Sequence, residues 1–210
     1  EYQLWDTVQA LSSYLRGIFS TRALLASAGV GDKNASPLAA AVTWVLRDGA
    51  AMIGSLALGY GAGSSFDSRL KEWRLFADII NDVGLTLNMV TPLIDKEDRP
   101  HLFFGVMAVA SVCTAMCGVA AGSTKASITA HMAMNGNTAD VSAKENAQET
   151  FVTLIGILSG IAVARWLNEL ESSASFTWSW MLFVMLTLLH VYANWRCVTA
   201  LKLRSLNRHR

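Results

Sequence analysis

Two long stretches of the chain carry almost no charge. Residues 102–124 contain no charged side chain, and residues 172–195 contain His190 as the one side chain that titrates near neutral pH. Each stretch exceeds the roughly 18 to 20 residues that an α-helix needs to cross a bilayer core of about 30 Å. A helix with one face in water would carry charge at about every turn. The pattern therefore predicts an integral membrane protein.

The other hydrophobic runs predict further helices of two kinds. From residue 4 to residue 19 the apolar positions fall at spacings of three and four, while Asp6, Arg16 and several serines occupy the other face. That pattern predicts an amphipathic helix that lies at the membrane interface or against the bundle without crossing it. The predicted spans cover about residues 37–61, 73–92, 101–125, 150–166 and 176–200.

Turn and cap signals separate these helices. Glycines, Asp32 and Asn34 interrupt the pattern over residues 29–34, and Ser36 before Pro37 is typical of a helix start. Residues 95–100 form a short charged turn, and residues 135–138 a polar loop. Ser142 with Glu145 has the form of a capping box, which predicts a helix start there. The sequence thus predicts an all-α fold: one domain over residues 1–210, a polytopic membrane bundle of about five transmembrane helices plus an N-terminal amphipathic helix.

Small residues recur at four-residue spacing on the predicted helices. This spacing lets helix backbones approach closely in lipid, so it predicts a packed bundle and contact with other membrane subunits. The positions are Ala110, Thr114, Gly118 and Gly122 on one helix, Gly156 and Gly160 on another, and Gly59 and Gly63 on a third.

Composition agrees with a membrane protein and argues against several other classes. Charged residues make up 16% of the 210 residues and apolar ones 52%, against about a quarter charged in an average soluble domain. A net charge of +1 gives no field that would attract nucleic acid. Basic residues gather at the C-terminal end, which we expect to face the cytosol or its organellar equivalent. They are Arg196, Lys202, Arg204, Arg208 and Arg210.

No catalytic or metal-binding motif is present in the sequence. The glycines near residues 29–31 and 59–63 lack the spacing and the following Lys-Ser/Thr of a phosphate-binding loop. The four histidines lie on separate predicted elements, Cys113, Cys117 and Cys197 form no metal or redox motif, and no hydrolase-type serine elbow occurs. We therefore expect no enzyme activity and no metal site, and the sequence leaves the cofactor unknown.

Polar side chains at membrane depth are the main candidates for function. They are Arg47, Asp48, Asp78, Asn81 and Asp82. An ionisable group in a span costs about 2.5–3.5 kcal/mol on insertion scales and usually faces a cavity or another charge. The cluster can be a polar pathway or ligand site, or a structural ion pair that fixes helix register. Because a guanidinium stays protonated, we expect Arg47 to bond Asp78 or Asp82.

Three further polar positions carry weaker hypotheses. His190 and Asn194 share a helix face, and a hydrogen-bonded pair that joins helices is the simpler interpretation. Lys125 follows small residues that would admit a ligand or another helix. Lys144, Glu145 and Glu149 are predicted to form a solvated helix start.

These motifs, taken in order, resemble the root UVB sensitive family over nearly the whole chain. The matching segments in the first half are Tyr-Gln-Leu-Trp-Asp at residues 2–6, Gly-Val-Gly-Asp at 29–32, residues 44–49 with Met52, and Trp-Arg-Leu-Phe-Ala-Asp at 73–78 with Asn81-Asp82. In the second half they are residues 118–122 with Thr124, 139–144 with 148–150, Leu189-His190 with 192–194, and 206–208. The resemblance implies an organellar or endomembrane protein, linked in plants to plastids, UV-B response, auxin transport and vitamin B6 balance. It implies no established reaction.

The sequence departs from the family pattern at three places. Ser55 stands where the family often has Arg, Lys125 where Arg is more usual, and Ala133-Met134-Asn135 where a basic pair often occurs. Positive charge is lost at two of these places, which argues against an anion or lipid site there and fits a scaffolding role.

Two functions remain open at this point. The first is a transporter-like module that handles a small solute at the Arg47, Asp48, Asp78, Asn81 and Asp82 cluster, in a plastid or mitochondrial membrane. The second is a non-catalytic subunit of a larger organellar membrane complex. In both cases the expected partners are the lipid bilayer and other membrane subunits, and not nucleic acid.

Overall fold

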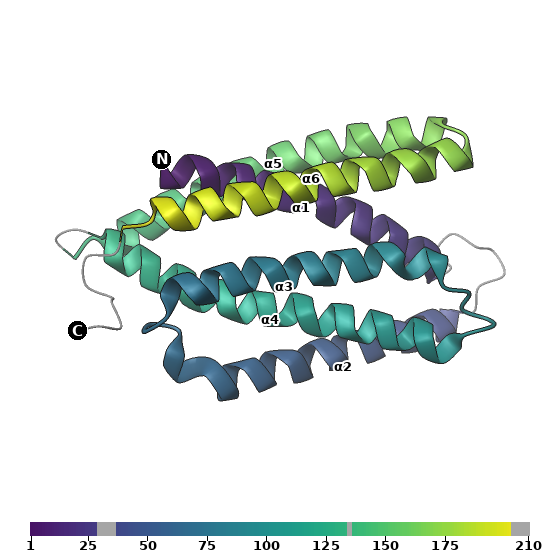
Figure 1. Ribbon diagram of the computed structural model, residues 1–210, viewed down its shortest axis with the longest axis horizontal. Helices are drawn as coiled ribbons and strands as arrows, with labels where there is room; N and C mark the ends of the chain where they lie inside the picture. The colour runs from purple at the N-terminus through teal and green to yellow at the C-terminus, as the bar shows by residue number, and fades with distance from the viewer. Residues whose placement is uncertain (29–36, 134–135, 203–210) are drawn as a thin grey trace. The chain divides into compact units, whose positions relative to one another are not determined.

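The computed structural model describes residues 1–28, 37–133 and 136–202 and is entirely helical over them (Figure 1). Its helices are α1 (Tyr2–Ser27), α2 (Pro37–Ala62), α3 (Leu70–Val90), α4 (Pro100–Met132), α5 (Thr138–Glu169) and α6 (Ser172–Ala200), with 3-10 turns at Gly63–Ser65 and Thr91–Leu93. The predicted break at residues 29–34, the helix start at Ser36, and Asn135, Arg204, Arg208 and Arg210 lie outside the described residues. The all-α prediction is confirmed.

Long apolar helices confirm the membrane-bundle class. Four helices in the described part are long and apolar enough to cross a membrane: α4, α5, α6 and the part of α2 at Ala41–Ala62. α3 was predicted as a fifth span, but it is not among the four because Lys71, Glu72, Arg74, Asp78 and Asp82 lower its hydropathy. The amphipathic helix α1 is also outside this set, as predicted.

The boundary between α4 and α5 differs from the prediction. α5 begins at Thr138 with Asn137 as its N-cap residue, so Ser142 lies inside the helix and the predicted capping box is wrong. Gly136, directly before the cap, has a φ of 76°. Glycine adopts this left-handed backbone without the steric penalty that a Cβ brings. The turn therefore ends with Gly136-Asn137, and the observed cap lies five residues before Ser142, the predicted cap.

The chain forms two compact units, and α1 and α4 contribute to both. One unit contains residues 1–19 and the chain from residue 125 onward; the other contains residues 20–124. In the first unit α5 and α6 form an antiparallel hairpin (Figure 1). Trp166 and Trp178 pack edge to face at the turn of this hairpin, with ring centroids 5.5 Å apart. Their half-exposed rings near the ends of the spans suit the headgroup level of a membrane.

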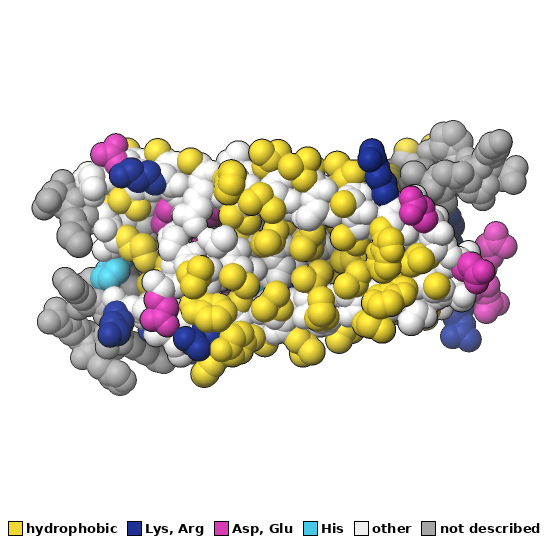
Figure 2. All heavy atoms as spheres, turned by 90° about the horizontal axis from the view of Figure 1, so that it is seen from above, with side chains coloured by type: hydrophobic (Ala, Val, Ile, Leu, Met, Phe, Trp, Pro, Cys, Tyr) yellow, Lys and Arg dark blue, Asp and Glu magenta, His cyan; other side chains and the backbone are white. Residues whose placement is uncertain are grey.

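Hydrophobic side chains cover the outer surface of the hairpin. Figure 2 shows a face whose middle is filled by hydrophobic side chains, while Lys, Arg, Asp and Glu gather towards the two ends. The exposed hydrophobic residues of α6 include Met181, Val184, Leu188, Val191 and Trp195. Exposed apolar patches of this extent are unusual in soluble monomers, and they suit contact with acyl chains.

In the second unit α2, α3 and α4 pack through aromatic and small residues. Trp73 of α3 lies edge to face against both Phe66 and Phe76, at centroid distances of 5.0 and 5.3 Å. Leu58, Phe66, Ala77 and Ala120 form the buried centre of this cluster. The helices approach closely at Gly84 of α3, where an added Cβ would lie 2.8 Å from Thr114 Cγ2 and 3.0 Å from the Ala110 carbonyl oxygen.

The predicted close packing of small residues is confirmed within the chain at some positions and is not seen at others. Ala110 and Thr114 do pack closely, against Gly84. Gly156 also packs closely, because an added Cβ would lie 2.5 Å from Tyr14 Cδ1, and a Cβ on Gly160 would overlap Ile18. Gly118, Gly122, Gly59 and Gly63 have no described atom within 4 Å of an added Cβ. The pattern predicted close packing at Gly118, but Gly118→Leu is not expected to disturb the packing of the chain itself.

The contrast between Gly84 and Gly118 gives a stability prediction. Gly84→Ala should destabilise the protein by about 1–3 kcal/mol, because backbone and side-chain atoms of α4 already occupy the space of the new methyl group. Gly118→Ala, also inside a helix, should leave stability unchanged or raise it by up to about 1 kcal/mol. Thermal unfolding of both variants in detergent checks this. Equal melting temperatures would show that α3 and α4 are not in close contact at Gly84.

Candidate functional site: a polar seam between α1 and α6

The buried face of α1 is its polar face. Arg16 is 0% exposed and Gln9 3% exposed, and Ser12 is buried with them, whereas Leu4 is 64% exposed. The helix therefore lies against the bundle, one of the two predicted placements, with its polar stripe inward. This orientation is the one expected next to lipid, since apolar side chains can face acyl chains while polar groups need partners inside the protein.

α6 presents a matching polar stripe. Thr187, His190, Asn194 and Cys197 follow one another at spacings of three, four and three residues, and the last three are buried. Asp6, Gln9, Ser13 and Arg16 of α1 have the same spacings. This spacing keeps side chains facing a partner helix along its length. We call these residues of α1 and α6 the polar seam. The prediction that His190 and Asn194 share a face is confirmed.

Contacts between the two helices set their register. The Cys197 thiol lies 4.0 Å from Asp6 Oδ1, and the Arg16 guanidinium donates a long 3.5 Å hydrogen bond to the Thr187 hydroxyl. From Asp6 to Arg16 the chain advances ten residues, and from Cys197 to Thr187 it goes back ten, so the helices are antiparallel and stay in step. Gln9 therefore lies level with Asn194, between these two contacts.

An ion pair closes the seam at its outer end. Arg196 donates a 3.2 Å hydrogen bond to the Glu1 carboxylate, and its guanidinium lies 4.9 Å from the centroid of the Trp5 ring. Trp5 also packs edge to face on Tyr192, at a centroid distance of 5.4 Å. These contacts hold the first turn of α1 against the last turns of α6.

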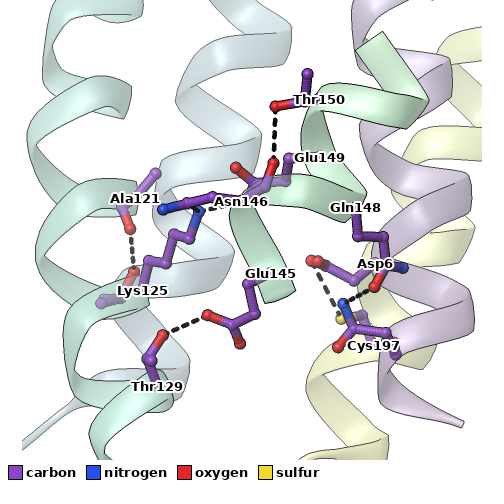
Figure 3. A network of polar contacts seen from close by, with 12 residues as sticks. Asp6, Ala121, Lys125, Thr129, Glu145, Asn146, Gln148, Glu149, Thr150 and Cys197 are labelled. Atoms are coloured by element: carbon purple, nitrogen blue, oxygen red, sulfur yellow. Dashed lines mark hydrogen bonds and ion pairs between the residues drawn. The ribbon is translucent and has the colours of Figure 1, made fainter. Parts of the chain in front are cut away.

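A second polar network joins α1, α4 and α5 in the same unit. Gln3 donates to Gln148 at 2.8 Å, and Gln148 donates to Thr7 at 2.7 Å, so one α5 side chain bridges two turns of α1. Figure 3 shows Lys125 and Thr129 of α4 pointing toward the first turns of α5.

The contacts of this network bear on two predictions about α4 and α5. Lys125 contacts Glu149 at 2.6 Å and Asn146 at 3.2 Å, so it bridges to another helix, one of its two predicted roles. Thr129 donates to Glu145 at 2.6 Å. Glu145 is therefore half-buried and bonded, although the sequence predicted a solvated residue.

The predicted intramembrane cluster is only partly assembled. In α3, Arg74 lies 3.8 Å from Asp78, which is 7% exposed, and Asp82 follows one turn later. Arg47 of α2 instead lies over the Trp44 ring, 4.8 Å from its centroid. Among the described residues the predicted ion pair from Arg47 to Asp78 or Asp82 is not formed, and Asp48 is exposed.

The physical reason for this difference lies within each helix. Arg74 precedes Asp78 by four residues, a spacing at which opposite charges on a helix meet without help from another helix. The aromatic face of Trp44 gives the Arg47 guanidinium a favourable contact on its own helix. The presence of Arg74 one turn before Asp78 was the signal in the sequence that could have predicted the observed pair.

Comparisons with known proteins identify the family to which this chain is similar. The family model described as a vitamin B6 photo-protection and homoeostasis domain matches residues 1–210. The chain is 40% identical to RUS family member 1 of Dictyostelium discoideum over 209 residues, and 41% identical to protein root UVB sensitive 3 of Arabidopsis thaliana over 206 residues. It belongs to the root UVB sensitive family.

The chain corresponds to part of these relatives. All of it aligns with the first relative and 98% with the second, but it spans 38% and 44% of their lengths. The chloroplastic protein root UVB sensitive 2 of Arabidopsis thaliana shows 31% identity over 209 residues, 45% of its own length. No solved structure matches the chain.

Several segments that suggested the root UVB sensitive family lie in the sites described above. Residues 2–6 form the start of α1, His190 and Asn194 belong to the polar seam, and residues 148–150 belong to the α5 network. The segment at residues 73–78 carries the Arg74–Asp78 pair. The family resemblance and the buried polar contacts thus fall on the same parts of the chain.

The buried guanidinium of the seam gives a stability prediction. Arg16→Met should destabilise the protein by roughly 1.5–3 kcal/mol, because it removes the hydrogen bond that the buried guanidinium donates to the Thr187 hydroxyl. Arg165→Met, at an exposed position of α5, should change stability by less than about 0.5 kcal/mol. Thermal unfolding in detergent compares the two. If both variants lost equally little stability, Arg16 would not be buried.

Proposed function

We propose that this domain is a transporter-like module that binds a small polar solute and helps to move it across an organellar membrane. The observation that supports it best is the fully buried Arg16 with Gln9, His190 and Asn194, in a unit whose α5 and α6 are apolar enough to span a bilayer. Ionisable and polar groups at such depth are costly, and in membrane proteins they mark solute and ion pathways.

The carboxylates of α3 are the second part of this proposal. Asp78, Asn81 and Asp82 stay the proposed polar site of the other unit, now with Arg74 as the observed partner of Asp78. Arg47 and Asp48, the other predicted members, contribute no observed contact to the α3 carboxylates among the described residues. The proposal therefore rests on α1, α3 and α6 more than on α2.

The family description suggests which solutes to test first. Vitamin B6 compounds combine ring hydroxyls and a pyridine nitrogen, and their phosphorylated forms add an anionic group. Buried amides and hydroxyls can bond the ring substituents, and a guanidinium can bond a phosphate. One relative is named chloroplastic. We propose a plastid or mitochondrial membrane as the location.

Transport gives the first functional prediction. Proteoliposomes that contain the protein should take up radiolabelled pyridoxine or pyridoxal 5′-phosphate faster than empty liposomes. His190→Leu should reduce the uptake at least about tenfold, because the imidazole is buried in the seam, and Arg165→Met should not change it. Uptake no faster than in empty liposomes for all vitamin B6 compounds would contradict the proposed function for this solute class.

A subunit role is the alternative, and the surface of α2 favours it. Val45, Met52 and Leu56 are exposed, Gly59 has open space around it, and the exposed Asp48 lies among them near the middle of the helix. An exposed carboxylate at that depth would be costly in lipid, and a partner helix that carries a hydrogen-bond donor or a cation would satisfy it.

This alternative predicts a change in assembly without a change in fold. Asp48→Leu should move the protein to a smaller complex on native gels of mildly solubilised membranes, while its melting temperature as a purified chain stays the same. Asp140→Asn removes an exposed carboxylate from the first turn of α5 and should leave the complex intact. An unchanged complex for Asp48→Leu would count against α2 as a subunit contact.

A further inference from the structure

Two buried residues with carboxamide side chains lie at the same level of the polar seam, and neither side-chain oxygen accepts a hydrogen bond within the described residues. Gln9 and Asn194 are each 3% exposed. Within the described residues, no hydrogen-bond donor lies in reach of Gln9 Oε1 or Asn194 Oδ1, and both atoms are shielded from the surface. Buried polar atoms are nearly always bonded, so an unsatisfied pair calls for a specific explanation.

The register of the helices places these two residues at the same level. Asp6 with Cys197 closes the seam on one side of them, and Arg16 with Thr187 closes it on the other. If the two carboxamides only joined the helices, one would donate a hydrogen bond to the oxygen of the other, as Gln3 donates to Gln148. Because both amide oxygens lack a donor, Gln9 and Asn194 do not bond each other in this way.

The hydrogen-bonding groups of Gln9 and Asn194, and the charge of Arg16, determine which chemical group of a ligand can bind between them. A carboxamide offers both a donor and an acceptor, and either of its two orientations presents one of each. The Arg16 guanidinium follows Gln9 by seven residues, two helical turns or about 10 Å along α1, and its charge disfavours a bound cation. A neutral group that both donates and accepts hydrogen bonds matches the two amides best.

We propose that Gln9 and Asn194 bind a neutral hydroxyl, amide or heteroaromatic edge of the transported solute. This assignment rests on the proposed function, because it places part of the solute inside the seam. Arg16, which donates a hydrogen bond to Thr187, lies two helical turns further along α1 and is not part of this assignment. The two carboxamides then determine selectivity for the neutral part of the solute, independently of any charged group it carries.

The test separates ligand binding from stability. Replacing a buried unsatisfied amide by a leucine of similar size should not lower the melting temperature, because no protein hydrogen bond to the amide oxygen is lost. Gln9→Leu and Asn194→Leu should therefore unfold at or above the wild-type temperature. Their affinity for pyridoxine, measured by scintillation proximity in detergent, should be about tenfold weaker, the equivalent of one or two lost hydrogen bonds.

A third buried amide supplies the matched control. Asn88 of α3 is also buried, and its Oδ1 also lacks a donor among the described residues, but it lies outside the seam. Asn88→Leu should resemble the seam variants in stability and bind pyridoxine as the wild type does. If a leucine variant fails to fold, Gln9→Ala and Asn194→Ala take its place, with the same expected loss of affinity.

The possible outcomes separate the two proposals. Pyridoxine binding that is weakened in both seam variants and intact in Asn88→Leu supports the assignment. Pyridoxine binding that all variants retain overturns the assignment and leaves the proposed function standing. If neither pyridoxine nor pyridoxal binds to the wild type, the proposed function fails for this solute class and the assignment falls with it.

Discussion

The fold of the first unit depends on one constraint: polar side chains in a helix bundle surrounded by lipid must find their partners inside the protein. α1 obeys it by turning Gln9, Ser12 and Arg16 inward and leaving Leu4 outside. α6 obeys it with His190, Asn194 and Cys197 on one buried stripe. The two stripes share a three-four spacing, so antiparallel packing aligns them residue by residue. The glycines of α5 then let this helix approach Tyr14 and Ile18 on another side of α1.

The need for partners inside the protein also explains the contacts of the charged residues on α2 and α3. A charged residue in an apolar surrounding is stabilised most simply by a partner on its own helix, and Arg74 lies one turn before Asp78. Arg47 finds the ring of Trp44 in a comparable way. Asp48, by contrast, is exposed on α2, and for this reason the surface of α2 is the part of the chain that most suggests a further protein partner.

Sequence reasoning predicted the helices and the membrane class because these follow from local properties. Uncharged runs such as residues 102–124 identify α4, and the three-four spacing of residues 4–19 identifies α1. The sequence alone could not assign the pairing of faces. It flagged His190 and Asn194 as a shared face but not their counterpart on α1, since that depends on which helices become neighbours. The contacts of Arg47 and Gly118 were mispredicted for the same reason: spacing within a helix does not say what lies opposite.

The orientation of α1 is the central claim, and cysteine cross-linking in native membranes tests it most directly. In a variant with Cys113, Cys117 and Cys197 replaced by alanine, Ser13→Cys should cross-link to His190→Cys through a short bifunctional reagent, because the register places these residues level on facing stripes. Leu11→Cys lies about 200° around α1 from residue 13 and should not cross-link to the same partner. Cross-linking through Leu11→Cys in place of Ser13→Cys would mean that the apolar face of α1 is inward, and would contradict the account.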